Sequence, residues 1–194
     1  MSQPICYDVQ LFDINAHLLQ ITVTLPANAQ QTILRLPNWI PGSYMIRDFA
    51  QHVHQEQARD SLDQALAWRK TSKHTWIIAP CKYDFTFSYM VFANDLSVRS
   101  AFINDQYAFF NGTSVFMQVI DDFDQKTQVL EDFGIYDDRE YSVRLFGNHH
   151  SLAHKWQVST TLPVVMKEDV HPLLQIESEY LLGHFQVTSY ANLI

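Results

Sequence analysis

Flexible and cross-linking residues are scarce in this chain. Its 194 residues include 5 glycines and 2 cysteines. So few glycines leave little room for flexible linkers, and two cysteines cannot build a disulfide framework. We expect Cys6 and Cys81 to be buried free thiols of a reducing compartment. Hydrophobic residues make up 47% of the chain, which predicts an ordered globular protein with one sizeable core, a single domain over residues 1–194.

Positive charge and long apolar runs are also lacking. The formal net charge is -8 at pH 7, and no basic stripe with interleaved aromatic residues counteracts it, so we expect no nucleic-acid partner. Residues 1–6 lack the basic region and long apolar core of a secretory signal, and no later run is apolar enough to span a bilayer. These absences predict a soluble cytoplasmic protein without a membrane partner.

Motifs for catalysis are missing as well. The sequence contains no His-Glu-x-x-His, the pattern that places two zinc ligands and a general base on one helix face. His150 and His154 have the spacing, but Ser151 stands where the base is needed. His52 and His54 would share a strand face without a third ligand. Because nucleophile elbows and phosphate-binding glycine loops are absent too, we predict no catalytic residue, metal ligand or cofactor in this chain.

Alternating hydrophobic residues are the main structural pattern. Residues 19–25 and 85–91 each alternate apolar and polar side chains, as strands with one wet face do. Further strands are expected at residues 7–11, 32–36, 52–58, 75–78, 113–119, 141–146 and 184–190, with a hairpin turn at Asn111-Gly112 and a loop or irregular helix over 121–138. This spacing predicts a mainly β fold, an antiparallel β-sandwich with a short helix and irregular loops.

One segment carries more pattern than local structure requires. Residues 36–50 read Leu-Pro-Asn-Trp-Ile-Pro-Gly-Ser-Tyr-Met-Ile-Arg-Asp-Phe-Ala, which predicts a strand, a proline-glycine turn and a short helix. The Trp-Ile-Pro-Gly-Ser-Tyr string followed by Arg-Asp-Phe-Ala resembles the N-terminal domain of glycyl aminopeptidases, zinc metallopeptidases of the gluzincin type that also carry a PDZ domain. Asp-Leu-Ser-Val-Arg at residues 95–99, Phe-Asn-Gly-Thr at 110–113 and the strand-like 156–163 extend the likeness in the same order.

Two departures concern the end of the chain. Ala191 stands where the family usually has an acidic residue, and residues 164–182 form a longer stretch than the family predicts. The resemblance implies a non-catalytic β domain that forms one wall of a peptide cleft. It also implies that zinc, the catalytic domain and the PDZ domain follow residue 194. The expected partners are this downstream catalytic domain and the peptide substrate.

The loop that contains Asn104, Asp105 and Tyr107 is the candidate for meeting substrate. A carboxylate can pair with the free α-ammonium of a peptide while aromatic rings supply an apolar wall. Arg99, which can bind a carboxylate through two hydrogen bonds, and Asn111 complete the predicted substrate-binding set. The alternative is that Asp105 caps a turn and that the aromatic residues pack in the sandwich.

Three further residues are predicted to have interdomain or structural roles. Trp39 and Tyr44 can present polar groups at an interface or act as buried plugs beside the turn. Arg47 can anchor a carboxylate in the substrate or in the adjoining domain, or it can pair with Asp48.

Two other functions remain open from the residues alone. One is a stand-alone β-sandwich that binds a peptide or a carbohydrate through the same aromatic loops. The other is an independent enzyme built on the histidine pairs. A sandwich separated from its partner domain can also expose an apolar face and self-associate.

Overall fold

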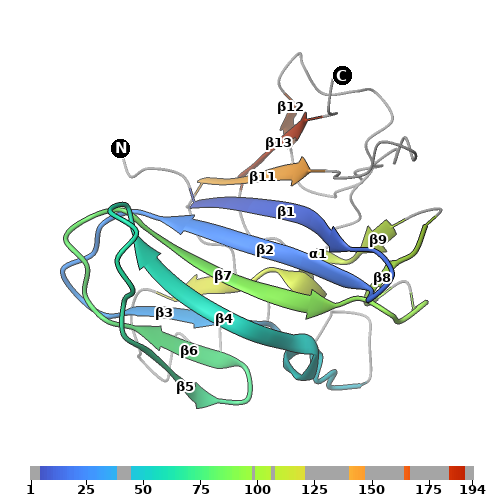
Figure 1. The fold of residues 1–194 in the computed structure, drawn as a ribbon, viewed down its shortest axis with the longest axis horizontal. Helices are drawn as coiled ribbons and strands as arrows, with labels where there is room; N and C mark the ends of the chain where they lie inside the picture. The colour runs from blue at the N-terminus through green and yellow to red at the C-terminus, as the bar shows by residue number, and fades with distance from the viewer. Residues whose placement is uncertain are drawn as a thin grey trace.

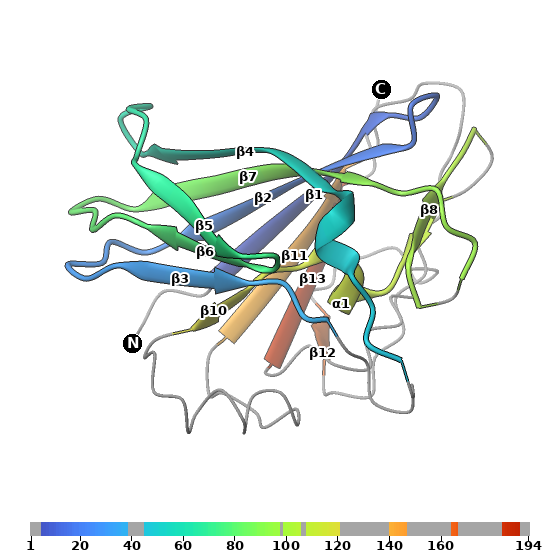
Figure 2. The same cartoon turned by 90° about the horizontal axis from the view of Figure 1, so that it is seen from below.

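Two β-sheets packed face to face form the body of the protein (Figure 1). The computed structural model describes residues 5–38, 45–97, 99–105, 108–120, 140–146, 164–166 and 184–190. Within these residues there are a seven-stranded sheet, a four-stranded sheet and a two-stranded hairpin. The predicted mainly β sandwich is confirmed, and Figure 2 shows its two layers from below.

The large sheet joins strands from both halves of the sequence. In spatial order it contains β12 (Val164–Met166), β13 (His184–Tyr190), β11 (Glu140–Phe146), β1 (Ile5–Asp13), β2 (Leu18–Leu25), β7 (Phe85–Phe92) and β4 (Val53–Asp60). Strands β1, β2, β7 and β4 pair antiparallel, as predicted. Strand β11 instead runs parallel to β1 and to β13, and β12 runs parallel to β13. Side-chain alternation is the same in both directions, so the sequence pattern could not distinguish them.

The small sheet covers the inner face of the large one. Its order is β10 (Gln118–Ile120), β3 (Thr32–Arg35), β6 (Thr75–Ile78) and β5 (Trp68–Ser72). A hairpin of β8 (Ala101–Ile103) and β9 (Ala108–Phe110) lies beside one end of the sandwich. Two short helices complete the described elements: the 3-10 helix η1 (Phe49–His52) and the one-turn helix α1 (Gly112–Val115).

Most of the predicted strands match the structure, although His52 ends η1 and β4 begins at Val53. The short helix predicted at the end of residues 36–50 begins only at Phe49, and the strand-like residues 156–163 lie outside the described residues. The clear exception is near residue 113. There the sequence predicted a hairpin turn at Asn111-Gly112 and a strand over 113–119, and this prediction was wrong. Helix α1 occupies the first part, and only Gln118–Ile120 is a strand. The helix forms because the Asn111 side chain caps its first turn. The predicted loop or helix at 121–138 lies outside the described residues.

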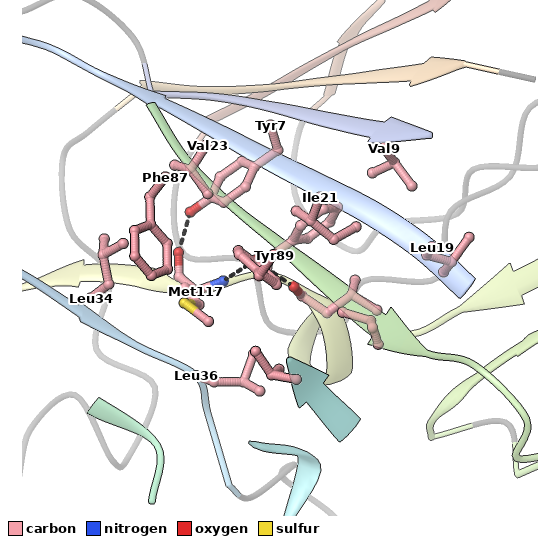
Figure 3. Packing of buried hydrophobic residues seen from close by; sticks show 14 of the residues in the cluster. Tyr7, Val9, Leu19, Ile21, Val23, Leu34, Leu36, Phe87, Tyr89 and Met117 are labelled. Carbon is pink, nitrogen blue, oxygen red and sulfur yellow. Dashed lines mark hydrogen bonds between the residues drawn. The ribbon is translucent and has the colours of Figure 1, made fainter. Parts of the chain in front are cut away.

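Alternating side chains of the large sheet fill the core between the layers (Figure 3). Strand β1 contributes Tyr7 and Val9, and strands β2 and β7 contribute the next rows. The small sheet contributes Leu34 and Trp76 from the opposite layer, and both side chains are fully buried. Each such side chain stabilises the fold by about 1.5–3 kcal/mol through burial. This core therefore supplies the rigid base on which the loops at either end are carried.

A bulge in the edge strand β4 links the two layers. The register shifts between His54 and Gln57, and Gln55 has a positive φ of 56°. Next to it, the Glu56 carboxylate accepts a hydrogen bond of 3.1 Å from Nε1 of the buried Trp76. The Lys70 ammonium lies 4.4 Å from the centre of the same indole ring. The bulge thus places the Glu56 carboxylate where it accepts the hydrogen bond of Nε1 of Trp76, which belongs to the other sheet.

Candidate functional site

The β8–β9 hairpin, which leads to the predicted substrate loop, is attached to the end of β7. The Asp95 N–H donates to the Ala101 carbonyl at 3.0 Å, and the Ile103 N–H donates to the Ala93 carbonyl at 2.9 Å. An isolated antiparallel bridge joins Asn94 to the same hairpin. These bonds place the loop after Ile103 at the end of the sandwich where β7 finishes.

The predicted substrate-binding residues differ in how exposed they are to solvent. Asp105 and Arg99 are exposed, and Asn104 is half-buried. Neither charged side chain forms a salt bridge with another of the described residues. Tyr107 lies outside the described residues. Arg99 precedes β8 and Asn104 and Asp105 follow it, so Arg99 and Asp105 lie beyond opposite ends of this strand. Their contact with a substrate stays a prediction.

Asn111 has a structural task at the start of α1. Its side-chain oxygen accepts hydrogen bonds from the Thr113 N–H at 3.1 Å and from the Thr113 hydroxyl at 2.6 Å. Its backbone carbonyl accepts from the Ser114 hydroxyl at 2.7 Å. The residue is buried, as are all four residues of the helix. These bonds stabilise the first helical turn, and the predicted role of Asn111 in substrate binding stays a prediction.

Two buried tyrosine hydroxyl groups hold the segment that follows α1 (Figure 3). The Tyr89 hydroxyl donates to the Val115 carbonyl at 2.7 Å and accepts from the Met117 N–H at 3.3 Å. The Tyr7 hydroxyl donates to the Met117 carbonyl at 2.5 Å. Burial raises the pKa of Tyr89 well above its ordinary range, and the neighbouring Tyr7 raises it further. The hydroxyl therefore stays protonated, and remains a donor, to a higher pH than that of an exposed tyrosine.

These contacts connect the core to the exposed loop. The Asn111 N–H donates to the Ser100 carbonyl at 2.8 Å, which ties the capped helix to the start of the hairpin. The segment after helix α1 is therefore hydrogen-bonded to the core through Tyr7 and Tyr89, and the start of the helix is bonded through Asn111 to Ser100, just before β8. Asp105 itself is exposed in the turn between β8 and β9, and binding residues are often found on loops that a rigid scaffold carries.

The predicted interdomain residues are only partly described. Trp39 and Tyr44 lie outside the described residues. Arg47 is half-buried, and its backbone N–H donates to the Asn38 carbonyl at 2.6 Å. Asp48 pairs with Lys73 at 2.9 Å, so the predicted pairing of Arg47 with its neighbour is not the one that the described side chains form. The interdomain role of Arg47 stays a prediction.

Comparison with known protein families shows which family this chain belongs to. The model of the peptidase M61 N-terminal domain matches residues 6–194. The chain belongs to this family. The resemblance that the two sequence motifs indicated is thereby confirmed. In this M61 N-terminal domain, the described parts of two of these motifs lie at the same end of the sandwich: residues 47–50 run into η1, and residues 95–97 follow the end of β7 (Figure 2).

A solved structure supports the same assignment. The crystal structure of the aminopeptidase N family protein from Idiomarina loihiensis is 34% identical to this M61 N-terminal domain, with a TM-score of 0.61 over 74% of the chain. The match covers 22% of that protein, so this chain spans about a fifth of its length. No curated protein is similar enough to count as a match.

Sequence reasoning missed one residue at this end, His17. It lies in the turn between β1 and β2 with a positive φ of 56°. Its Nδ1 is hydrogen-bonded to the Ile103 carbonyl, and its ring centre lies 5.9 Å from that of Phe102 and 6.2 Å from that of Phe92. Only the pairing of β2 with β7 brings these rings together, so no local pattern could have indicated the contact.

The described residues provide no zinc site and no membrane span. Among them, no three His, Cys, Asp or Glu side chains are grouped to hold a metal. His52 ends η1 and does not belong to the following strand, and its carbonyl is 3.1 Å from Nδ1 of His54. Within the same part of the chain, every helix is too short or too polar to cross a bilayer.

Proposed function

We propose that this M61 N-terminal domain is a non-catalytic wall of the peptide cleft in a longer zinc-dependent aminopeptidase and packs on its catalytic domain. The observation that carries the proposal is that residues 47–50 and 95–97, described parts of two family motifs, lie at one end of the sandwich, where Asp105 is exposed in the turn of the β8–β9 hairpin. The small share of the Idiomarina protein that the chain matches supports a longer polypeptide. That residues 1–194 form one domain, followed by catalytic and PDZ domains, stays a prediction.

The side chains at this end of the sandwich are of the types that can recognise the N-terminus of a peptide. The Asp105 carboxylate can accept hydrogen bonds from an α-ammonium group, and the half-buried rings of Phe102 and Phe109 stack nearby with their centres 6.1 Å apart. A charge-assisted hydrogen bond of this kind contributes about 1.5–3 kcal/mol when it is shielded from water. Arg99 can pair with a carboxylate of the substrate or of the adjoining domain.

Zinc does not fit the described part of this chain, because that part offers no cluster of ligands. We therefore assign the metal and the bond-breaking chemistry to other residues of the longer polypeptide, and the role of this domain is to bind and orient. A cytoplasmic location is also part of the proposal. It is supported by Cys6 and Cys81, neither of which is in a disulfide. Cys81 is buried as predicted, whereas Cys6 is half-buried, so its predicted burial was wrong.

The experiment compares two single-charge variants of the full-length enzyme. Asp105→Asn removes the carboxylate at the proposed cleft, and Asp63→Asn removes an exposed carboxylate at the opposite end of the sandwich, where asparagine tolerates the positive φ of 62°. We expect Asp105→Asn to raise KM for peptides with a free N-terminus about tenfold, the equivalent of about 1.4 kcal/mol. The melting temperatures of both variants should stay near that of the wild type.

Two results would contradict the proposal. One is equal KM values for Asp105→Asn and Asp63→Asn. The other is a large fall in melting temperature for Asp105→Asn with normal turnover by the protein that remains folded, which would make Asp105 structural. The alternative of a stand-alone binding module is tested by the mass of the native polypeptide, because only that reading predicts a product of 22.6 kDa.

A further inference from the structure

Exposed hydrophobic side chains gather at one end of the sandwich. Among the described residues seven large ones are exposed. Five of them lie in or next to the end of β1, the end of β7 or the start of η1, and strand register brings these three points to one end of the sandwich, which Figures 1 and 2 show as ribbons. These five, which we call the apolar end, are Phe12, Met45, Ile46, Phe92 and Leu96. Single exposed hydrophobic residues are normal, but a gathering of them marks an interaction surface.

Part of the apolar end is held in a fixed arrangement. The Phe92 ring, 40% exposed, packs edge-on against His17 at 6.2 Å and lies 6.4 Å from His52 between ring centres. His17 is in turn anchored to the hairpin through the Ile103 carbonyl. A side chain that is already fixed loses little conformational entropy when a partner covers it, so this surface is preorganised for docking.

The direction of the last described strand shows at which end of the sandwich β13 finishes. Strand β13 runs parallel to β11, which runs parallel to β1, and the register aligns Tyr190 with Phe146 and Phe146 with Gln10. Tyr190 therefore lies at the same end as Phe12. In the longer polypeptide of the proposed function, β13 is therefore a strand that ends at the same end of the large sheet as the apolar end. A domain tethered there has a high effective concentration at this surface.

Charge around the apolar end adds to the description of the partner. Asp13, Asp48, Asp95 and Asp105 are exposed there, against exposed Arg99 and Lys73, of which Lys73 is paired with Asp48. The carboxylates of Asp13 and Asp95 already accept backbone N–H groups of Ala16 and Ser97, so they are fixed in position. A complementary surface is apolar at its centre and carries Lys or Arg at its rim.

We propose that the apolar end is the docking face for the catalytic domain of the same polypeptide. This inference rests on the proposed function and adds the surface through which the two domains pack. Docking covers the side chains of Ile46, which is 77% exposed, and Leu96, which is 65% exposed, in this structure. It also leaves the loop after Ile103 at the border of the interface, where Asp105 can face a cleft between the domains.

The test uses matched leucines in the full-length protein. Leu96→Asp places a charge on the apolar end, and Leu62→Asp places the same charge on an equally open residue, 58% exposed, at the opposite end. Hydrogen exchange is measured at residues 45–48, which neither substitution alters. We expect exchange there to be at least tenfold faster in Leu96→Asp, because undocking exposes the whole surface, and unchanged in Leu62→Asp. Ile46→Asp, measured at residues 92–97, should give the same acceleration.

Equal exchange in Leu96→Asp, Ile46→Asp and Leu62→Asp would overturn the inference. It would also be overturned if the apolar-end variants turned a dimer into a monomer in sedimentation while exchange within each copy stayed unchanged, since the surface would then pair two copies. The KM of Asp105→Asn tests the proposed function separately. If exchange is faster in the apolar-end variants while the KM of Asp105→Asn equals that of the wild type, the docking face is supported and the role of Asp105 in the cleft is refuted.

Discussion

Replacing Tyr89 with phenylalanine removes one oxygen atom from the centre of the core. That oxygen donates to the Val115 carbonyl at 2.7 Å and accepts from the Met117 N–H at 3.3 Å. Val115 and Met117 are both fully buried, so water cannot replace the lost hydroxyl. The substitution keeps the ring and its packing, and its effect therefore reports the two hydrogen bonds.

The expected loss of stability follows from the groups left behind. A buried backbone group without a partner costs about 1–3 kcal/mol. The carbonyl of Val115 loses a short bond, whereas the N–H of Met117 loses a long and weaker one. Removing the hydroxyl also removes the cost of burying it, which offsets part of the loss. We expect Tyr89→Phe to lower the free energy of unfolding by about 2–3 kcal/mol, a large share of the roughly 5–15 kcal/mol typical of a domain.

Urea denaturation followed by circular dichroism at pH 7 measures this loss. Tyr83→Phe is the matched control, since Tyr83 is 36% exposed and contacts Lys82 through its ring. Its change should stay within about 0.5 kcal/mol. Equal stabilities of the two variants would refute the claim that the buried hydroxyl holds the segment after α1. In a double variant, Tyr7→Phe should add less than its own separate loss, because both hydroxyls act on Met117.

Three further predictions concern the polar contacts of the sandwich. Burial raises the pKa of Tyr89, so as the pH rises the unfolded chain loses the Tyr89 proton before the folded chain does. The contribution of this group to the free energy of unfolding is therefore fully present below about pH 10 and falls by up to about 1.4 kcal/mol per pH unit above it. Denaturation across pH 9–11 should show a shallower fall in Tyr89→Phe. Asn111→Ala should cost about 1–2 kcal/mol in urea denaturation and Asn111→Ser less than half of that, because serine keeps an acceptor for the helix cap. Glu56→Ala should lower the melting temperature by leaving Trp76 Nε1 unpaired, at about 1–2 kcal/mol, whereas Glu56→Gln should keep most of the stability through its amide oxygen.

Some site predictions followed from local chemistry and others could not. The exposed position of Asp105 agrees with a polar residue beside a short strand, and the pattern of the motif residues alone indicated the family. Asn111 was predicted to meet substrate, yet its oxygen is bonded to Thr113 within a helix turn. Asn-Gly is equally typical of a hairpin turn, and only the contacts of the following segment with Tyr7 and Tyr89 distinguish the two conformations.

The amino-acid sequence by itself determined the strands of the core and the family. A period of two in residues 19–25 and 85–91 allows one buried face and one wet face, and burial of the apolar face stabilises that arrangement over others. Only the tertiary structure decided that β11 and β13 run parallel to β1, since the direction of pairing depends on contacts between strands far apart in the chain. The antiparallel pairing of β1 with β2 and of β2 with β7 brings Phe12, Phe92 and Leu96 to one end, because separate strands must align before their ends can form a common surface.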